Sequence, residues 1–182
     1  MSTGDVTALL AVLATVGAVA GALVVVALLV PSLRVRLLDA VGDQGLPVAW
    51  LVALVATLGS LYLSEVAHFD PCRLCWYQRI AMYPLVVVLG VGWWRRDGSA
   101  RLMGLILAGL GLAVNLWHLA VELWPTLEGS GCDPLNPCSL RWVEQWGFWT
   151  IPRMATVAFS LVILGLVVDA LAARSDPEVV IP

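Results

Sequence analysis

Two cysteines followed by a permanent cation are the residues of this chain best suited to chemistry. Cys72 and Cys75 stand in "FDPCRLCWYQRIAMYPL", residues 69–85. C-x-x-C is the spacing of redox-active thiols, whose lowered pKa supplies the attacking thiolate. Arg79 follows Cys75 by four residues, so on a helix it lies on the same face and stabilises an anion there. The segment therefore predicts thiol–disulfide chemistry.

The residues before the pair predict where the helix begins. Asp70 is a good N-cap and Pro71 a good first helical residue, so Cys72 is expected in the first turn and Cys75 at its end. The positive end of the helix dipole favours a thiolate at that place.

A second pair, Cys132 and Cys138, lies in "GSGCDPLNPC", where glycines precede the pair and two prolines separate it. A mobile loop suits a cysteine that must meet one partner and then another, whereas a purely structural loop disulfide is the alternative. The tryptophan spacing of the following "SLRWVEQWGFW", residues 139–149, predicts a short helix in the outer headgroup plane. A re-entrant segment packed on protein is the alternative there.

Two structural uses of the cysteines compete with redox chemistry. The first is a structural disulfide between Cys72 and Cys75. It is disfavoured because a bond within C-x-x-C closes so short a loop that it stabilises the fold very little. A zinc site built from all four cysteines is disfavoured by the wide spacing of the second pair, and no metal is expected.

The elements that position these residues belong to a membrane. The 182 residues are 60% hydrophobic and 13% charged, whereas soluble domains carry about a quarter charged residues. Apolar runs at 6–30, 47–66, 75–94, 102–119 and 152–172 are long enough, or nearly so, to cross about 30 Å of hydrocarbon. The net charge is −3 and no lysine occurs, so no nucleic-acid partner is expected.

The arginines predict the orientation. The loops after the first and third runs and the C-terminal tail hold Arg34, Arg36, Arg95, Arg96, Arg101 and Arg174, whereas the other side holds Arg73, Arg79, Arg141 and Arg153. The richer side is expected to be cytoplasmic. The chain is then expected to be a multi-pass protein of the cell membrane. Both cysteine pairs and the N-terminus lie on its extracytoplasmic side, where disulfides persist, and the C-terminus lies in the cytoplasm.

The stretch "PCRLCWYQRIAMYPL" resembles the DsbB family of membrane disulfide-forming oxidoreductases, particularly its BdbC-like branch. The resemblance covers residues 47–172. It implies an all-α fold: a four-helix transmembrane bundle, here with one extra N-terminal transmembrane helix, five in total, and a short horizontal helix in the second outer loop. Residues 1–46 would hold the extra helix and a cytoplasmic loop, 47–173 the catalytic bundle and 174–182 a disordered cytoplasmic tail.

The resemblance also implies a function and roles. Such an enzyme re-oxidises a DsbA-like thioredoxin-fold thiol oxidase outside the membrane and passes the electrons to a membrane quinone, menaquinone or ubiquinone. It thereby supports disulfide formation in exported proteins. Cys132 would meet the partner, Cys138 would pass electrons to Cys72, and Cys75 would face the quinone beside Arg79. The roles of Cys132 and Cys138 could be exchanged.

Other polar residues lie in or beside the runs. His118, near the outer end of the fourth run, could bind a quinone carbonyl or supply a proton, and Asn115 lies one turn deeper. Glu65, Glu122 and Asp169 are expected to be solvated interface charges.

Two rival functions remain open. A vitamin K epoxide reductase-like quinone reductase also uses four cysteines in a membrane bundle, but there the C-x-x-C follows the spaced pair, whereas here it precedes it. A non-enzymatic membrane protein with two structural disulfides is the other rival. Its Cys72–Cys75 bond would have a far more reducing potential.

Overall fold

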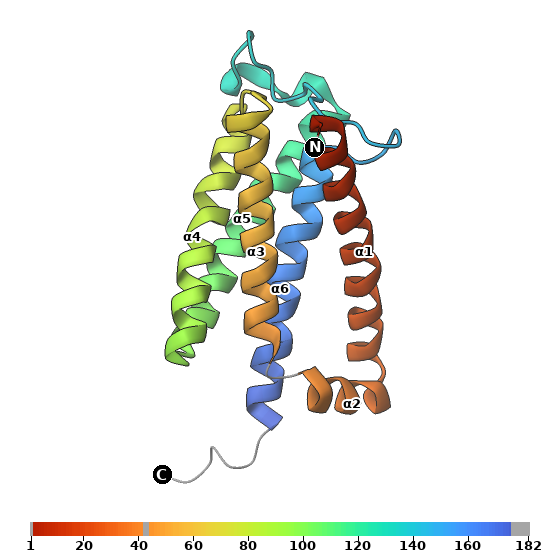
Figure 1. The fold of residues 1–182 in the computed structure, drawn as a ribbon, viewed down its shortest axis with the longest axis vertical. Helices are drawn as coiled ribbons and strands as arrows, with labels where there is room; N and C mark the ends of the chain where they lie inside the picture. Colours follow the sequence, from red (N-terminus) through yellow and green to blue (C-terminus); the bar gives the residue numbers. More distant parts are fainter. Residues whose placement is uncertain (1, 42–43, 176–182) are drawn as a thin grey trace.

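Five long helices run along the molecule in the computed structural model, which describes residues 2–41 and 44–175 (Figure 1). Together with the short helix α2, the α-helices of the described residues are α1 (Thr3–Leu29), α2 (Pro31–Val41), α3 (Gly45–Leu61), α4 (Arg73–Arg95), α5 (Ser99–Leu123) and α6 (Ile151–Ser175). All but α2 are long and apolar enough to cross a membrane. The predicted all-α architecture with five spans is therefore confirmed.

Short helical turns complete the described chain. A π-helical turn, η2 (Tyr62–Val66), continues α3, and two 3₁₀ turns, η3 (Pro125–Leu127) and η4 (Gly129–Gly131), follow α5. Helix α6 extends to Ser175, and residues 176–182 of the predicted tail lie outside the described part.

The predicted first cytoplasmic loop contains a helix. Pro31 ends α1 and occupies the first position of α2, a place where its missing N–H costs nothing. Helix α2 lies across the lower end of the bundle, and its Leu38 is buried.

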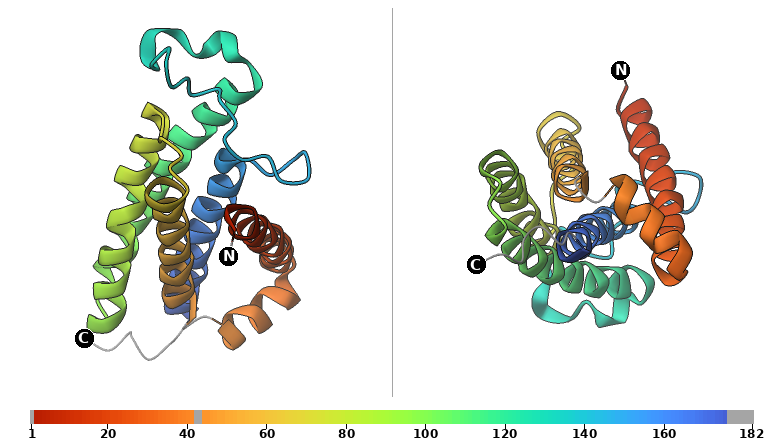
Figure 2. Two further views of the ribbon diagram at one scale, coloured as in Figure 1. Left: turned by 45° about the horizontal axis from the view of Figure 1, so that its top comes forward. Right: turned by 90° about the horizontal axis from the view of Figure 1, so that it is seen from below.

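Helices α3 to α6 enclose the main core. Its buried members include Ala49, Ala53, Leu85, Leu89, Phe159, Val162 and Leu166. Small residues let helix backbones approach closely, as is usual between membrane helices. Helix α1 stands beside α6 at the edge of the bundle, away from α4 (Figure 2).

The connection between α5 and α6 corrects one prediction. Residues 139–149 form turns and a single bridge between Gln145 and Trp149 instead of a horizontal helix. Trp146, with a φ of 54°, and Gly147, with a φ of 68°, are left-handed and interrupt helical geometry. Two of the tryptophans contact other segments: Trp142 stacks on Phe69, with centroids 5.4 Å apart, and Trp149 is buried, whereas Trp146 is exposed.

The start of α4 and the connection from α5 to α6, the two segments with the cysteine pairs, lie at the same end of the bundle as the N-terminus (Figure 1). The C-terminal end of α6 and helix α2 lie at the other end. This relative arrangement agrees with the predicted sidedness of the loops.

We expect Gly111→Ala to destabilise the bundle. A Cβ at Gly111 would collide with the Phe159 ring and lie 2.9 Å from the Cβ of Ala81, so α5 could not keep its contact with α4 and α6. Overpacking of this kind costs about 1–3 kcal/mol. Gly109→Ala, two residues away and facing open space, is the matched control. Equal thermal unfolding of the two variants in detergent would contradict this packing.

Candidate redox site

Cys72 is the N-cap of α4, not Asp70 as predicted. The helix begins at Arg73, and the Cys75 backbone N–H donates to Cys72 Sγ over 3.3 Å. The sulfur thus takes up one of the amides that a helix start leaves without a partner. Both cysteines therefore lie at the membrane edge of α4, with Cys72 just outside the span.

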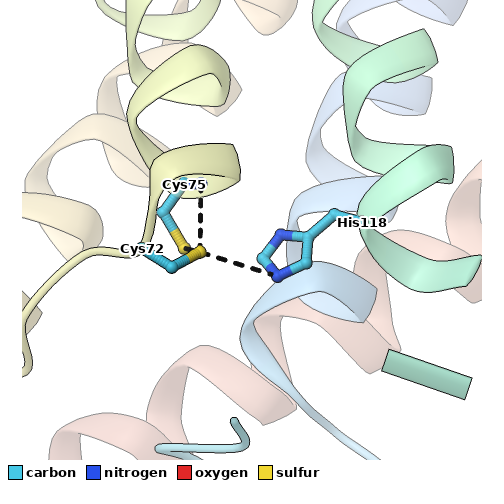
Figure 3. Close-up of side chains that lie close together, drawn as sticks. All are labelled: Cys72, Cys75 and His118. Atoms are coloured by element: carbon cyan, nitrogen blue, oxygen red, sulfur yellow. Dashed lines mark hydrogen bonds between the residues drawn. The ribbon is translucent and has the colours of Figure 1, made fainter. Parts of the chain in front are cut away.

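The two sulfurs of the C-x-x-C lie 3.0 Å apart and are reduced (Figure 3). The hydrogen bond shared with Cys75 lowers the pKa of the Cys72 thiol; burial opposes this shift, and the contact with His118 supports it. Because the Cys75 amide also donates to Cys72, the donors converge on the Cys72 sulfur. This sulfur is the better place for a thiolate in the reduced pair.

His118 comes from α5 and lies between the two cysteine pairs. Its Nε2 is 3.8 Å from Cys72 Sγ (Figure 3). The same nitrogen is 2.9 Å from the carbonyl oxygen of Cys138. The buried Gln78 amide nitrogen lies 2.8 Å from Nδ1. If Gln78 donates there, Nδ1 accepts, and Nε2 carries the proton that it donates to Cys138.

Gln78 was not singled out from the sequence. In the sequence, a glutamine three residues after Cys75 looks like an ordinary polar residue near the start of a helix, and no local pattern indicates a functional role. Its contact with His118 arises only because α5 packs on α4.

Cys132 and Cys138 form a disulfide that packs against the first pair. Cys138 and Cys72 share a buried cluster with Val121, and Cys132 and Cys75 pack at its margin. Cys138 is buried, whereas Cys132 is half-buried and the more accessible sulfur. A zinc site made from all four cysteines does not fit, because two of them are already joined.

Two carboxylates hold the loop in place. Glu128 accepts hydrogen bonds from the Cys138 N–H and, over 2.8 Å, from the Ser139 hydroxyl. Glu122, predicted to be solvated, is instead buried and pairs with Arg141 at 3.5 Å and Arg153 at 3.3 Å. The prediction failed because the loop folds back over the end of α5 and covers this carboxylate.

A cavity of about 390 Å³ begins on the other side of Cys75. Its polar end is lined by Cys75, Gln78 and Arg79, and its remaining walls are mainly apolar side chains of α1, α3 and α6. The Arg79 guanidinium donates to the hydroxyl and carbonyl of Ser60 over 3.1 and 3.0 Å. It also lies over the Trp76 ring, 5.3 Å from the centroid.

The predicted residues thus divide between two compartments. Arg79 lines the large cavity, His118 and Cys72 line a second cavity of about 20 Å³, and Cys75 lines both. Asn115 is buried and donates to the Pro152 carbonyl over 3.1 Å, a contact that joins α5 to α6.

The region that contains the site is similar in sequence to known proteins. Residues 44–136 match the family model "Disulfide bond formation protein DsbB". Disulfide bond formation protein C of Bacillus subtilis (strain 168) is 43% identical over 117 residues, 64% of this chain and 85% of that protein. A probable disulfide formation protein of Deinococcus radiodurans is 42% identical over 132 residues, 66% of this chain and 85% of the relative.

No solved structure matches the chain. The family match contains the C-x-x-C, Arg79, His118 and Cys132 and ends two residues before Cys138. With half of its length covered, this chain belongs to the disulfide bond formation protein DsbB family.

Proposed function

We propose that this membrane protein re-oxidises a DsbA-like thioredoxin-fold protein and passes the electrons to a membrane quinone, menaquinone or ubiquinone. One observation carries the proposal: the Cys72–Cys75 pair touches the Cys132–Cys138 disulfide on one side and the large apolar cavity on the other. Electrons that come from a water-soluble protein and go to a lipid-soluble quinone need a redox pair that contacts both sides.

The cavity residues fit a quinone. A ring with carbonyl oxygens needs hydrogen-bond donors at one end, and a prenyl tail needs apolar walls. Arg79 offers a guanidinium fixed by Ser60, and Gln78 offers an amide at the same end as Cys75. A bound quinone would supply the two-electron acceptor.

Thiol–disulfide exchange carries the electrons inward. A thiolate of the partner attacks Cys132 and breaks its bond to Cys138, which leaves as a thiolate. The partner's second thiolate resolves this mixed disulfide, so the partner leaves oxidised and both loop cysteines are reduced.

The loop pair then reduces the inner pair. Cys138 attacks Cys72 and Cys75 leaves, and Cys132 resolves the new bond by attacking Cys138.

The last step returns the inner pair to its disulfide. Arg79 and Gln78 would hold a quinone at the Cys75 end of the cavity, and a bound quinone would accept two electrons, with two protons, as the Cys72–Cys75 bond forms. Arg79 favours negative charge at the polar end of the cavity. We propose that the Nε2–H of His118, 3.8 Å from Cys72, stabilises the Cys72 thiolate before this bond forms. Its direct contact with a quinone stays a prediction, because His118 is not among the residues that line the large cavity.

The rival functions have less support. The order of the cysteine pairs and the family membership both argue against a vitamin K epoxide reductase-like enzyme. Two structural disulfides are disfavoured because the surroundings of Cys72 lower the pKa of its thiol and so favour the reactive thiolate.

The purified protein should oxidise a reduced DsbA-like partner only when quinone is present. Replacing any of the four cysteines by Ser should lower this rate at least a hundredfold, because each sulfur enters a covalent step. A partner that keeps only its attacking cysteine should accumulate a mixed disulfide with Cys132, because it lacks the second thiolate that resolves this bond. The complex should be visible on non-reducing gels and lost with dithiothreitol. Ser160→Ala, at an exposed position of α6, is the control that keeps all four sulfurs. Undiminished quinone reduction by Cys72→Ser or Cys75→Ser would overturn the proposal, and a complex linked through Cys138 instead would exchange the two loop roles.

We infer from the arginine bias that the cysteine end faces outward and the C-terminus lies in the cytoplasm. After reduction of intact cells, a membrane-impermeant maleimide should label Cys132, the more accessible sulfur of the loop. A cysteine introduced in place of Ser99, at the start of α5, should react only after lysis. The reverse pattern would invert the proposed direction of electron flow.

A further inference from the structure

Helix α1 lies outside the family match, yet it lines the cavity that Cys75 faces. The match begins at residue 44, whereas α1 ends at Leu29. Five of its residues line the cavity: Leu10, Leu13, Ala14, Val16 and Gly17. We propose that α1 is a wall of the quinone site and binds the prenyl tail. This proposal rests on the proposed function and gives the extra helix a role in it.

Contacts at the outer end fix α1 beside the redox site. The Gln145 side-chain amide donates to the buried Thr7 hydroxyl over 2.7 Å. One turn further, Ala11 and Ala14 pack against the buried Trp149. Helix α1 is thereby attached to the loop that carries the second cysteine pair, at the level where the cavity has its polar end.

Further along, α1 contacts the helices on both sides of the cavity. Leu10 reaches α3, where a Cβ built on Gly59 would lie 3.0 Å from its Cδ2. Gly17 faces α6, and a Cβ there would lie 2.7 Å from Leu161 Cδ1. By touching α3 and α6, the helix closes a side of the cavity that would otherwise open to lipid.

The shape of the cavity suits a head group with a tail. Along α3 the lining runs from Ser60, beside Arg79, to Leu51, and nine residues of helix rise about 14 Å. The lining residues of α1 and of α3 below Ser60 are all apolar or glycine, whereas Cys75, Gln78 and Arg79 gather at the outer end. A lipid acyl chain would also fit the apolar part, but the donors beside a redox-active sulfur favour the tail of the electron acceptor.

Substitutions in this wall should change the recognition of the tail. Leu13→Trp adds a large ring to the cavity wall. Leu9→Trp makes the same change one turn earlier at a residue that does not line the cavity, and the two leucines are 46% and 48% exposed. Val16→Phe and Val19→Phe form a second pair, with Val16 lining the cavity and Val19 outside it.

Steady-state oxidation of the reduced partner should be measured with a prenylated naphthoquinone and with menadione, which has the same ring without the tail. For Leu13→Trp and Val16→Phe, the KM ratio of prenylated quinone to menadione should rise about tenfold over that of the unmodified protein. For Leu9→Trp and Val19→Phe, the ratio should stay within twofold. Reduction of the Cys132–Cys138 disulfide by the partner, without quinone, checks that each variant is folded.

Three outcomes would overturn the role of α1. An unchanged ratio in both cavity variants would mean that the wall does not touch the tail and that an acyl chain of the membrane occupies the groove. Equal rises with both quinones would show an effect on the ring instead of the tail. Equal effects of cavity and control variants would show a general disturbance. If the unmodified protein reduced neither quinone, the proposed function itself would fail, which is a distinguishable result.

Discussion

The start of α4 at the edge of the apolar bundle is the constraint on which the rest of the structure depends. The Cys75 amide donates to the Cys72 sulfur, so the helix begins between the two cysteines. Cys72 is consequently turned toward His118 and the loop, and Cys75 toward the large cavity. If the C-x-x-C pair lay one helical turn deeper, it would no longer contact the Cys132–Cys138 disulfide. If it lay outside the helix, it would no longer line the large cavity.

Buried polar contacts keep the outer loop against this helix start. Unpaired charges at such a depth are costly, so Glu122 is stable there only with Arg141 and Arg153 across it. Glu128 satisfies the Cys138 amide, and His118 satisfies its carbonyl. The loop that brings the second disulfide to Cys72 is therefore held by groups from the loop itself and from the end of α5, while Gln145 fixes α1 to its far side.

The sequence predicts the spans well because lipid leaves the backbone little choice: an apolar run of this length must form a helix. It also predicts a site at the four cysteines and Arg79, whose types and spacing are local, and the structure brings the four cysteines into one cluster. Prediction from the sequence fails where contacts between distant segments determine the local structure. The tryptophans of residues 139–149 have helical spacing, yet Trp142 packs on Phe69 and Trp149 on α1. The partners of Gln78 and Glu122 come from α5 and the folded loop, which no local pattern reveals.

The assignment of Cys75 to the quinone and Cys72 to the loop is the central claim. Visible absorption of the purified protein with bound quinone tests it in two matched variants. Cys72→Ser leaves the sulfur in the cavity wall, so an electron-rich thiolate beside an electron-poor ring should give a charge-transfer colour that fades on acidification. Cys75→Ser leaves only the sulfur beside His118 and should stay colourless. Colour in Cys75→Ser and none in Cys72→Ser would contradict the assignment.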